Sequence, residues 1–232
     1  MKLLLRTAGA AVACVALATS ACSRCADPEE RSPLDGIPAP AREVAGTDPV
    51  FFERVPLGGD ADAFYRAVAA LADLSEEEAR ELVTCRPQAV VDVFHFGAGA
   101  VVERASGGHR LESCALERLG RFASVDIASI RGELVDGRLA AVRFAFPAAA
   151  AGTVRGMLTD RFGPGASREL DVRFAVGDER RAFTLWNVRG EIYALAAGEI
   201  SAELVHQNPR VAQTLPAPAP ASERGEPVDL TD

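Results

Sequence analysis

The sequence predicts an α+β fold, a two-layer sandwich in which one helix packs across a mainly antiparallel sheet. Hydrophobic residues make up 48% of the 232 residues, which is enough for a buried core. Between residues 90 and 206, most segments alternate apolar and polar side chains, a pattern typical of strands with one buried face. The stretch 147–162 instead repeats its apolar residues at helical spacing. The expected order is a β-hairpin, this helix and a β-meander, after two short helices.

The two short helices are expected at the start of the domain. Asp62 is a suitable N-cap for the first, which runs to about residue 74. Ser75 and Glu78 have the spacing of a capping box, which predicts the start of the second. Pro87 is expected to stop this second helix near Val83. The side chains that the second helix should bury are Ala79, Leu82 and Val83.

The first strand is predicted over Val90–Phe96, where β-branched and aromatic residues predominate. A short strand at 101–102 and a turn at 106–108 follow. Residues 111–119 fit either a strand or a helix, and the sequence leaves both open. From residue 122 the pattern is clearer, because Asp136-Gly137 is a strong hairpin signal between two alternating segments.

The predicted long helix opens at Pro147, a favoured residue in the first helical turn. Gly163-Pro164-Gly165 ends it. Its apolar stripe consists of Val154, Met157, Leu158 and Phe162. In the meander that follows, turns are expected at Gly177-Asp178 and Arg189-Gly190. The last two strands are expected at 192–196 and 200–206.

Residues 1–21 have the features of a cleaved signal peptide. Lys2 and Arg6 make the start positive, an apolar stretch follows, and Thr19-Ser20-Ala21 are small. The apolar stretch is too short to span a bilayer comfortably. We therefore expect export, with cleavage near Ala21.

Cys22 directly follows these small residues, and this arrangement resembles the lipobox of bacterial lipoproteins. The resemblance covers the signal region only, and Thr19 stands where leucine is typical. It implies acylation of Cys22, and Ser23 in the next position implies the outer membrane in a Gram-negative cell. The alternative is ordinary secretion to the periplasm or medium with a free N-terminal Cys22.

The expected domain organisation has four parts. Residues 1–21 are the signal peptide, and 22–59 are a lipid-anchored Pro-rich tether whose Phe51 and Phe52 dock onto the domain. Residues 60–214 form a single α+β domain. Residues 215–232 form a Pro/Ala-rich acidic tail that is expected to be disordered.

Cys85 and Cys114 lie in the folded region of an exported protein, so we predict that they form a disulfide. Cys25 is left over, and the Cys22-Ser23-Arg24-Cys25 spacing lacks the second pair that a zinc site needs. The formal net charge is −8, and it is about −10 once residues 1–21 are removed. This charge argues against nucleic acid as a partner, because phosphate binding requires a basic surface.

Three residues are weak candidates for a functional site: His95, His109 and Trp186. The two histidines titrate near neutral pH, and His95, between two phenylalanines in a strand, is expected to face solvent. Convergence of both histidines with Asp92 or Glu103 as a metal site is a minor alternative. Trp186 suits cation–π stacking, although core packing is its commoner role.

No catalytic set, metal ligand set or cofactor motif is recognisable in the sequence. The leading hypothesis is therefore a non-enzymatic envelope lipoprotein that presents a sheet face or hairpin loops to another protein. Its expected partners are a membrane, through the N-terminal lipid, and an unknown envelope protein. The alternative is a small periplasmic hydrolase that uses a histidine, or an inhibitor of an exported hydrolase.

Overall fold

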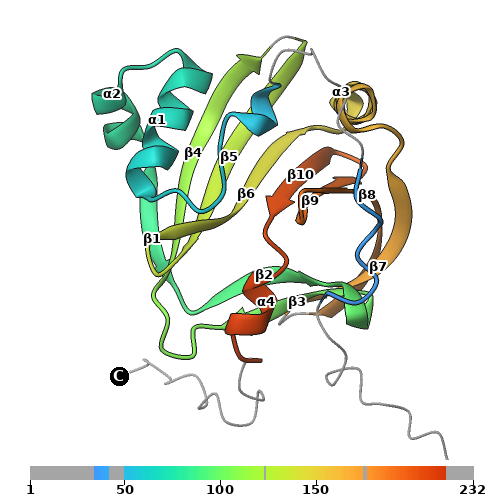
Figure 1. Ribbon diagram of the computed structural model, residues 1–232. Helices are drawn as coiled ribbons and strands as arrows, with labels where there is room; N and C mark the ends of the chain where they lie inside the picture. Colours follow the sequence, from blue (N-terminus) through green and yellow to red (C-terminus); the bar gives the residue numbers. More distant parts are fainter. Residues whose placement is uncertain (1–33, 42–49, 123, 175–176, 218–232) are drawn as a thin grey trace, which may run out of the picture.

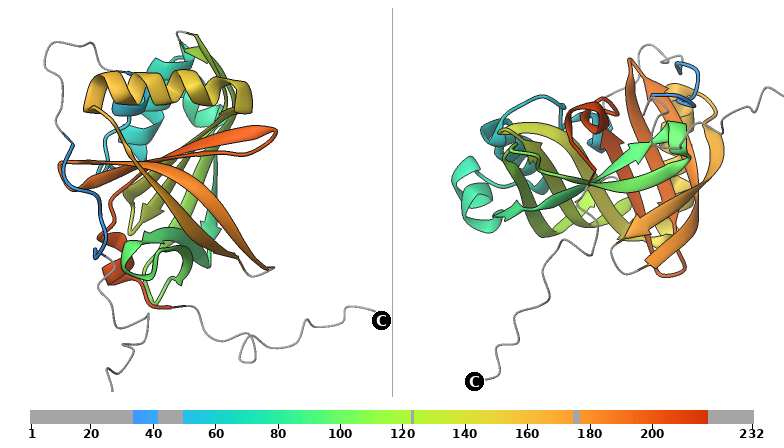
Figure 2. Two further views of the ribbon diagram at one scale, coloured as in Figure 1. Left: turned by 90° about the vertical axis from the view of Figure 1, so that its right-hand side faces the viewer. Right: turned by 90° about the horizontal axis from the view of Figure 1, so that it is seen from below.

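Ten strands form one sheet that curls into a half-barrel (Figures 1 and 2). The computed structural model describes residues 34–41, 50–122, 124–174 and 177–217, and the signal region with Cys22 and Cys25 lies outside them. The strands are β1 (Thr84–Gln88), β2 (Val90–His95), β3 (Ala100–Ala105), β4 (Leu111–Phe122), β5 (Val125–Val135), β6 (Arg138–Pro147), β7 (Ala166–Phe174), β8 (Gly177–Val188), β9 (Glu191–Ala197) and β10 (Ser201–Gln207).

The strand order is β1-β4-β5-β6-β10-β9-β8-β7-β3-β2. All neighbouring strands are antiparallel except β3 and β7, which are parallel. The predicted two-layer α+β sandwich is therefore wrong. A twisted sheet of this size curls, and a bulge in β4 between Glu117 and Gly120 increases the bend. Through this curl the sheet covers part of its own inner face, where the prediction placed a layer of helix.

The two edge strands of the sheet, β1 and β2, are consecutive in the chain and are separated only by Ala89. Side chains from the opposite wall bond to the backbone of β2. Arg143 of β6 donates to the carbonyl of Asp92 at 3.2 Å, and the amide of Phe94 donates to Oε1 of Gln207 at 3.3 Å. These bonds tie β2 to β6 and β10 and occupy part of its backbone edge.

The outer face of the sheet carries the main hydrophobic core. The 3₁₀ turn η2 (Phe51–Glu53), α1 (Ala61–Ala72) and α3 (Ala151–Phe162) cover this face. Phe51 and Phe52 are fully buried, so the predicted docking of these two residues is confirmed. Gly132 allows close contact with α1, because a Cβ there would lie 2.8 Å from the ring of Phe64. Val154, Leu158 and Phe162 of α3 are also buried, as its apolar stripe predicted.

A second apolar cluster lies on the inner face, where the β2–β3 hairpin approaches β7 to β10. Its aromatic members include Phe94, Phe96 and Phe183, with the Phe94 ring edge-on to that of Phe183 at 5.4 Å between centroids. Leu215 is 3% exposed and belongs to a third cluster with Val91 and Val93. The chain after α4 (Val211–Thr214) is therefore packed at its start, and residues 218–232 lie outside the described ranges.

Local signals in the sequence predicted the first helices well. The N-cap of α1 is Asp60, two residues before the predicted Asp62, and α2 (Glu76–Leu82) has the predicted capping box between Ser75 and Glu78. Leu82 is 54% exposed, so its predicted burial is wrong. Pro87 lies within the edge strand β1, which is a position that tolerates proline.

The predicted turns were mostly correct. Both residues of Asp136-Gly137 and both of Arg189-Gly190 have positive φ, as a two-residue type I′ hairpin requires. Residues 111–119, whose sequence fitted either a strand or a helix, are part of strand β4. Gly177 and Asp178 do not form a turn, because both are paired with β7 at the start of β8.

The Cys85–Cys114 disulfide is confirmed. The two residues are direct partners in the β1–β4 pairing, and their sulfur atoms are 2.05 Å apart. The bond fastens the edge strand β1, whose five residues are all exposed, to the buried Cys114 of β4. None of the described helices is both long and apolar enough to cross a membrane.

Candidate functional site: a carboxylate-rich cleft inside the curled sheet

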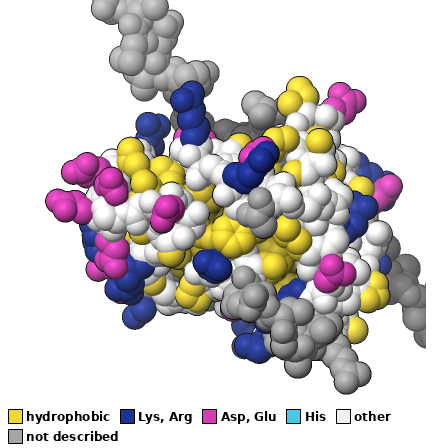
Figure 3. Space-filling view, turned by 90° about the horizontal axis from the view of Figure 1, so that it is seen from above, with side chains coloured by type: hydrophobic (Ala, Val, Ile, Leu, Met, Phe, Trp, Pro, Cys, Tyr) yellow, Lys and Arg dark blue, Asp and Glu magenta, His cyan; other side chains and the backbone are white. Residues whose placement is uncertain are grey.

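The end of the molecule at which α3 lies shows apolar side chains near its centre and charged side chains around them (Figure 3). No site is assigned to this surface. The inner side of the curled sheet offers a better defined hollow.

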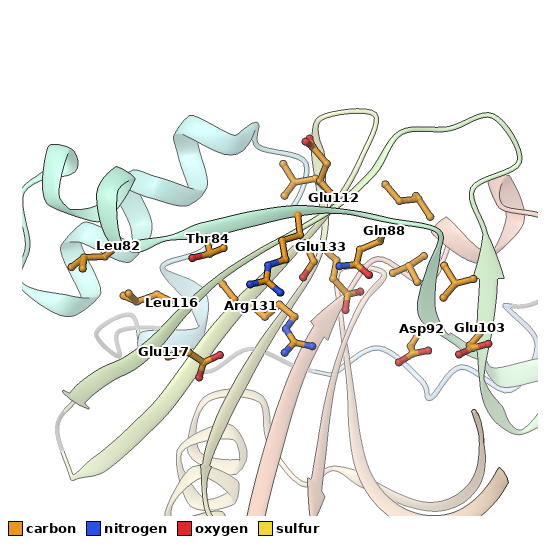
Figure 4. Close-up of a pocket in the computed structure, with 17 residues that line it drawn as sticks. Leu82, Thr84, Gln88, Asp92, Glu103, Glu112, Leu116, Glu117, Arg131 and Glu133 are labelled. Carbon is orange, nitrogen blue, oxygen red and sulfur yellow. The ribbon is translucent and has the colours of Figure 1, made fainter. Parts of the chain in front are cut away.

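A cleft of about 710 Å³ lies between the wall formed by β1, β4 and β5 and the β2–β3 hairpin (Figure 4). A smaller cavity of about 190 Å³ adjoins it, because Asp92, Arg131 and Glu133 line both. The smaller cavity also has apolar walls, made by Phe94, Val101, Val172, Phe183 and Val205. The two together form a polar groove that leads to a partly apolar recess.

The alternation of the strands places these charges inside. Residues 130, 132 and 134 of β5 face the outer core, so Arg131 and Glu133 face inward. In β6, Phe144 likewise faces outward and Arg143 inward. The curl of the sheet then turns these inward positions toward the β2–β3 hairpin, where Asp92 and Glu103 lie side by side (Figure 4).

Negative charge predominates in the larger cleft. Five acidic residues line it, namely Asp92, Glu103, Glu112, Glu117 and Glu133, and two basic residues, Arg86 and Arg131. Two of the five are already paired, since Arg110 donates to Glu112 at 2.6 Å and Arg143 donates to Glu133 at 2.7 Å. The remaining excess of carboxylate favours a cation in the cleft.

Arg143 links three strands at the back of the cleft. Its Nε donates to Oε1 of Glu133 at 2.7 Å, and its guanidinium lies 3.6 Å from Glu203. It also donates to the backbone of Asp92, as described above. Burial disfavours its charge, but the carboxylates of Glu133 and Glu203 outweigh that effect and raise the pKa of Arg143. Arg143 therefore keeps its positive charge, and this charge is already paired with the neighbouring carboxylates.

Three carboxylates at this point, those of Glu133, Asp92 and Glu103, lack a hydrogen-bond or ion-pair partner for at least one oxygen among the described residues. Glu133 is 9% exposed, and its Oε2 is buried without a hydrogen-bond partner among the described residues. Asp92 and Glu103 are direct cross-strand partners, an arrangement in which like charges repel. Burial raises the pKa of Asp92, Arg143 opposes this, and Glu133 and Glu103 add to it. A buried acceptor without a hydrogen-bond donor raises the free energy of the folded protein. The site therefore lacks a donor for Oε2 of Glu133.

The predicted candidate residues lie elsewhere. His95 is 3% exposed, so the expectation that it faces solvent is wrong; its Nδ1 lies 3.0 Å from Arg104. His109 pairs with Asp136 at 2.6 Å on a surface turn. Trp186 is buried in the outer core and donates to the carbonyl of Gly163 at 2.8 Å. The structure does not bring these three residues together in the cleft.

The minor metal alternative predicted one pairing correctly. Asp92 and Glu103 do face each other across the hairpin, but His109 has Asp136 as its partner instead. No group of three metal-ligating side chains occurs within the described residues. Arg131, Glu133 and Arg143 were not singled out from the sequence. Their only signal is that charged residues interrupt otherwise apolar strands, as in Ile130-Arg131-Gly132-Glu133-Leu134.

Comparison with protein-family models, with curated proteins and with solved structures found no match. The argument for function therefore depends on the chemistry of the cleft.

Proposed function

We propose that this protein is an exported, lipid-anchored envelope protein that binds another envelope component in the cleft and does not catalyse a reaction. The observation that carries the binding role is the unsatisfied carboxylate pair and the orphan Oε2 of Glu133 in a cleft of about 710 Å³. A concave site with a few converging polar groups is the usual form of a binding site.

Two further features support the proposed location. The Cys85–Cys114 disulfide suits an oxidising compartment, where such bonds persist. The signal-like residues 1–21 and Cys22 supply a route out of the cytoplasm and an attachment point for lipid. The attachment itself is tested by the intact mass of the membrane-fraction protein. A diacylglyceryl-plus-acyl mass on a chain that begins at Cys22 is expected, and an unmodified mature mass in the medium would contradict it.

The hydrolase alternative receives less support from this site. Among the described residues, no histidine lines the cleft or the recess. His206 has a carboxylate neighbour, Glu191 at 2.7 Å, but it is 3% exposed and stacked against Tyr193. A substrate has no access to such a ring without rearrangement of the core.

The binding role is tested by photocrosslinking in intact cells. A photoreactive residue in place of Gln88, which lines the cleft, is expected to capture a defined envelope component. The matched control carries the same residue in place of Glu77, on the first turn of α2, and is expected not to capture it. Equal capture at both positions, or none at Gln88, would contradict the binding of another envelope component in the cleft.

A further inference from the structure

We propose that the cleft binds a primary ammonium group carried on an apolar stem, with the ammonium held by Glu133, Asp92 and Glu103 and the stem in the recess. This inference rests on the proposed binding function and names the chemistry of its ligand. A free alkylamine presents this chemistry with its methyl end in the recess, whereas a lysine of a partner protein would have to place its backbone there.

The first argument is the orphan acceptor. Oε1 of Glu133 is held by Arg143 at 2.7 Å, so the carboxylate is fixed in place. Oε2 is buried and has no donor among the described residues, in a residue that lines both cavities. A ligand with N–H donors supplies the missing bond, and a hydrogen bond between charged partners is stronger than one between neutral ones.

The second argument is the pair of like charges on the hairpin. Asp92 and Glu103 are direct partners, both line the cleft, and neither side chain has an ion-pair partner among the described residues. A cation between them removes their repulsion. Since the acids of the cleft do not converge as a metal-ligand group, an ammonium bonds to two of them at a time through its three N–H donors and neutralises the third through space.

The third argument is the recess. Five apolar side chains line its walls beside the same carboxylates, and its volume is about 190 Å³. This volume is roughly that of six waters in the liquid, which is enough for a stem of about four to six carbons. Arg143 and Glu203 at the back of the recess are engaged with each other. The apolar walls of the recess therefore contact the stem, and the carboxylates beside the recess accept hydrogen bonds from the ammonium.

Among the described residues, four arginines line the two cavities, and Arg131 opposes this ligand most directly, because Arg143 and Arg181 are paired with carboxylates and Arg86 lines only the larger cleft. Arg131 lines both cavities, is exposed, and has no ion pair with another described residue. Its charge is outweighed by the three open carboxylates, but it should weaken the binding of a simple cation. An Arg131→Gln variant is therefore expected to bind an amine more tightly. An anion site would show the opposite effect, because the variant removes a positive charge.

The experiment is isothermal titration of the full chain with n-hexylamine at pH 7 and 150 mM salt. The matched probes are 1-hexanol, which lacks the charge, and methylammonium, which lacks the stem. Both are expected to bind at least tenfold more weakly than hexylamine. Equal binding of hexanol would overturn the ammonium part of the proposal, and equal binding of methylammonium would overturn the stem part.

The variants locate the site. Asp92→Asn and Glu103→Gln are each expected to weaken hexylamine binding by about fivefold or more. Glu77→Gln on α2 removes the same charge elsewhere and is expected to change it less than twofold, because salt screens distant charges. Glu133→Gln should show the largest loss, with circular dichroism as the check on folding. Unchanged affinity in Asp92→Asn and Glu103→Gln, or weaker binding in Arg131→Gln, would overturn the assignment.

The source of the amine is read from a second probe, Nα-acetyl-lysine methylamide. Weaker binding of this probe than of hexylamine is expected, because its backbone end would have to occupy the recess, and tighter binding would overturn the placement of the stem. If neither amine binds but Gln88 still crosslinks to an envelope component, the binding function stands and the ammonium assignment is wrong. If amines bind but nothing crosslinks, the ligand is small and the protein-binding role is wrong.

Discussion

The two faces of β5 and β6 contain the same strands but have opposite chemistry. Outward from the curl, Ile130 and Phe144 are fully buried beneath helices and aromatic side chains. Inward, at the positions adjacent to these two, lie Arg131 and Arg143, and the inward Glu133 completes the charged wall. The outer face is stabilised by close packing. The inner face is held by ion pairs and retains an acceptor without a donor. This difference separates a face held by apolar packing from a face held by ion pairs and rich in charge.

The largest effect is expected from the outer face. Phe144→Ala removes a ring that is fully buried and lies 5.1 Å, centroid to centroid, from the ring of Phe51. The cavity left behind should lower the free energy of unfolding by about 3–5 kcal/mol. Urea denaturation followed by the fluorescence of the single tryptophan, Trp186, measures it. A loss below about 1 kcal/mol would mean that the outer face is not the main core.

The next effect is expected at the edge that closes the cleft. A Cys85→Ala/Cys114→Ala variant loses a bond between residues 29 positions apart. The chain-entropy model gives a loss of about 3–4 kcal/mol in the free energy of unfolding. Treatment of the wild-type protein with a thiol reductant should produce a similar loss, and it should have no effect on the variant. A wild-type protein whose urea midpoint is the same with and without reductant would contradict this prediction.

A smaller effect on the free energy of unfolding is expected from the inner face, and it should depend on both Arg143 and Glu133. Arg143→Met leaves Glu133 as a buried charge without its cation, which should cost about 3 kcal/mol. The double variant Arg143→Met/Glu133→Met should recover most of that loss, because an apolar pair needs no compensation. Urea denaturation of the two single variants and the double variant forms the cycle. Additive losses would show that the two side chains do not act as a pair.

The smallest effect is a pH dependence at Asp92. Burial raises the pKa of Asp92, Arg143 opposes the increase, and the Glu133, Glu103 and Glu203 carboxylates reinforce it. The folded protein therefore holds this proton more tightly than the unfolded chain, and Asp92 contributes stability at low pH. That contribution falls as pH rises from below the ordinary value of 3.8 through the raised pKa.

The Asp92→Asn variant isolates this contribution. It should match the wild-type protein in unfolding free energy at the acid end and exceed it slightly at neutral pH. The difference between the two pH profiles is the measurement, because acids distant from Asp92 titrate equally in both proteins. A variant that is less stable than the wild-type protein at pH 7 would show that the Asp92 carboxylate makes a favourable contact in the unliganded state.

The sequence predicted features that depend on neighbouring residues. The capping box of Ser75 and Glu78 and the turn at Asp136-Gly137 involve residues at most three positions apart, and both were correct. The strands were also largely correct, because alternation is a local property. The curl was not predicted, since the pairing of β3 with β7 joins residues about 70 positions apart and leaves no local trace.

The candidate site was missed for the same reason. His95 was expected to face solvent because its neighbours Phe94 and Phe96 are apolar, but the curl buries both sides of the end of β2. Arg143 and Glu133 appeared in the sequence as the solvated side of their strands. Only the closure of the sheet brings them opposite Asp92. The hairpin partners Asp92 and Glu103 were the one part of the site that a local prediction reached.

The parallel contact of β3 with β7 has a consequence for motion. It consists of three residue pairs, Ala100↔Asp171, Val101↔Val172 and Val102↔Arg173, whereas each flanking pairing is an antiparallel hairpin. Pairing of distant segments forms late in folding, because the intervening chain must be ordered first. The short β3–β7 contact is therefore where we expect the native protein to unfold locally. The hairpins on either side should exchange their amide hydrogens more slowly. Movement of the β2–β3 hairpin at this contact would also break the bonds to Arg143 and Gln207, so amide hydrogen exchange in β3 measures both sets of contacts.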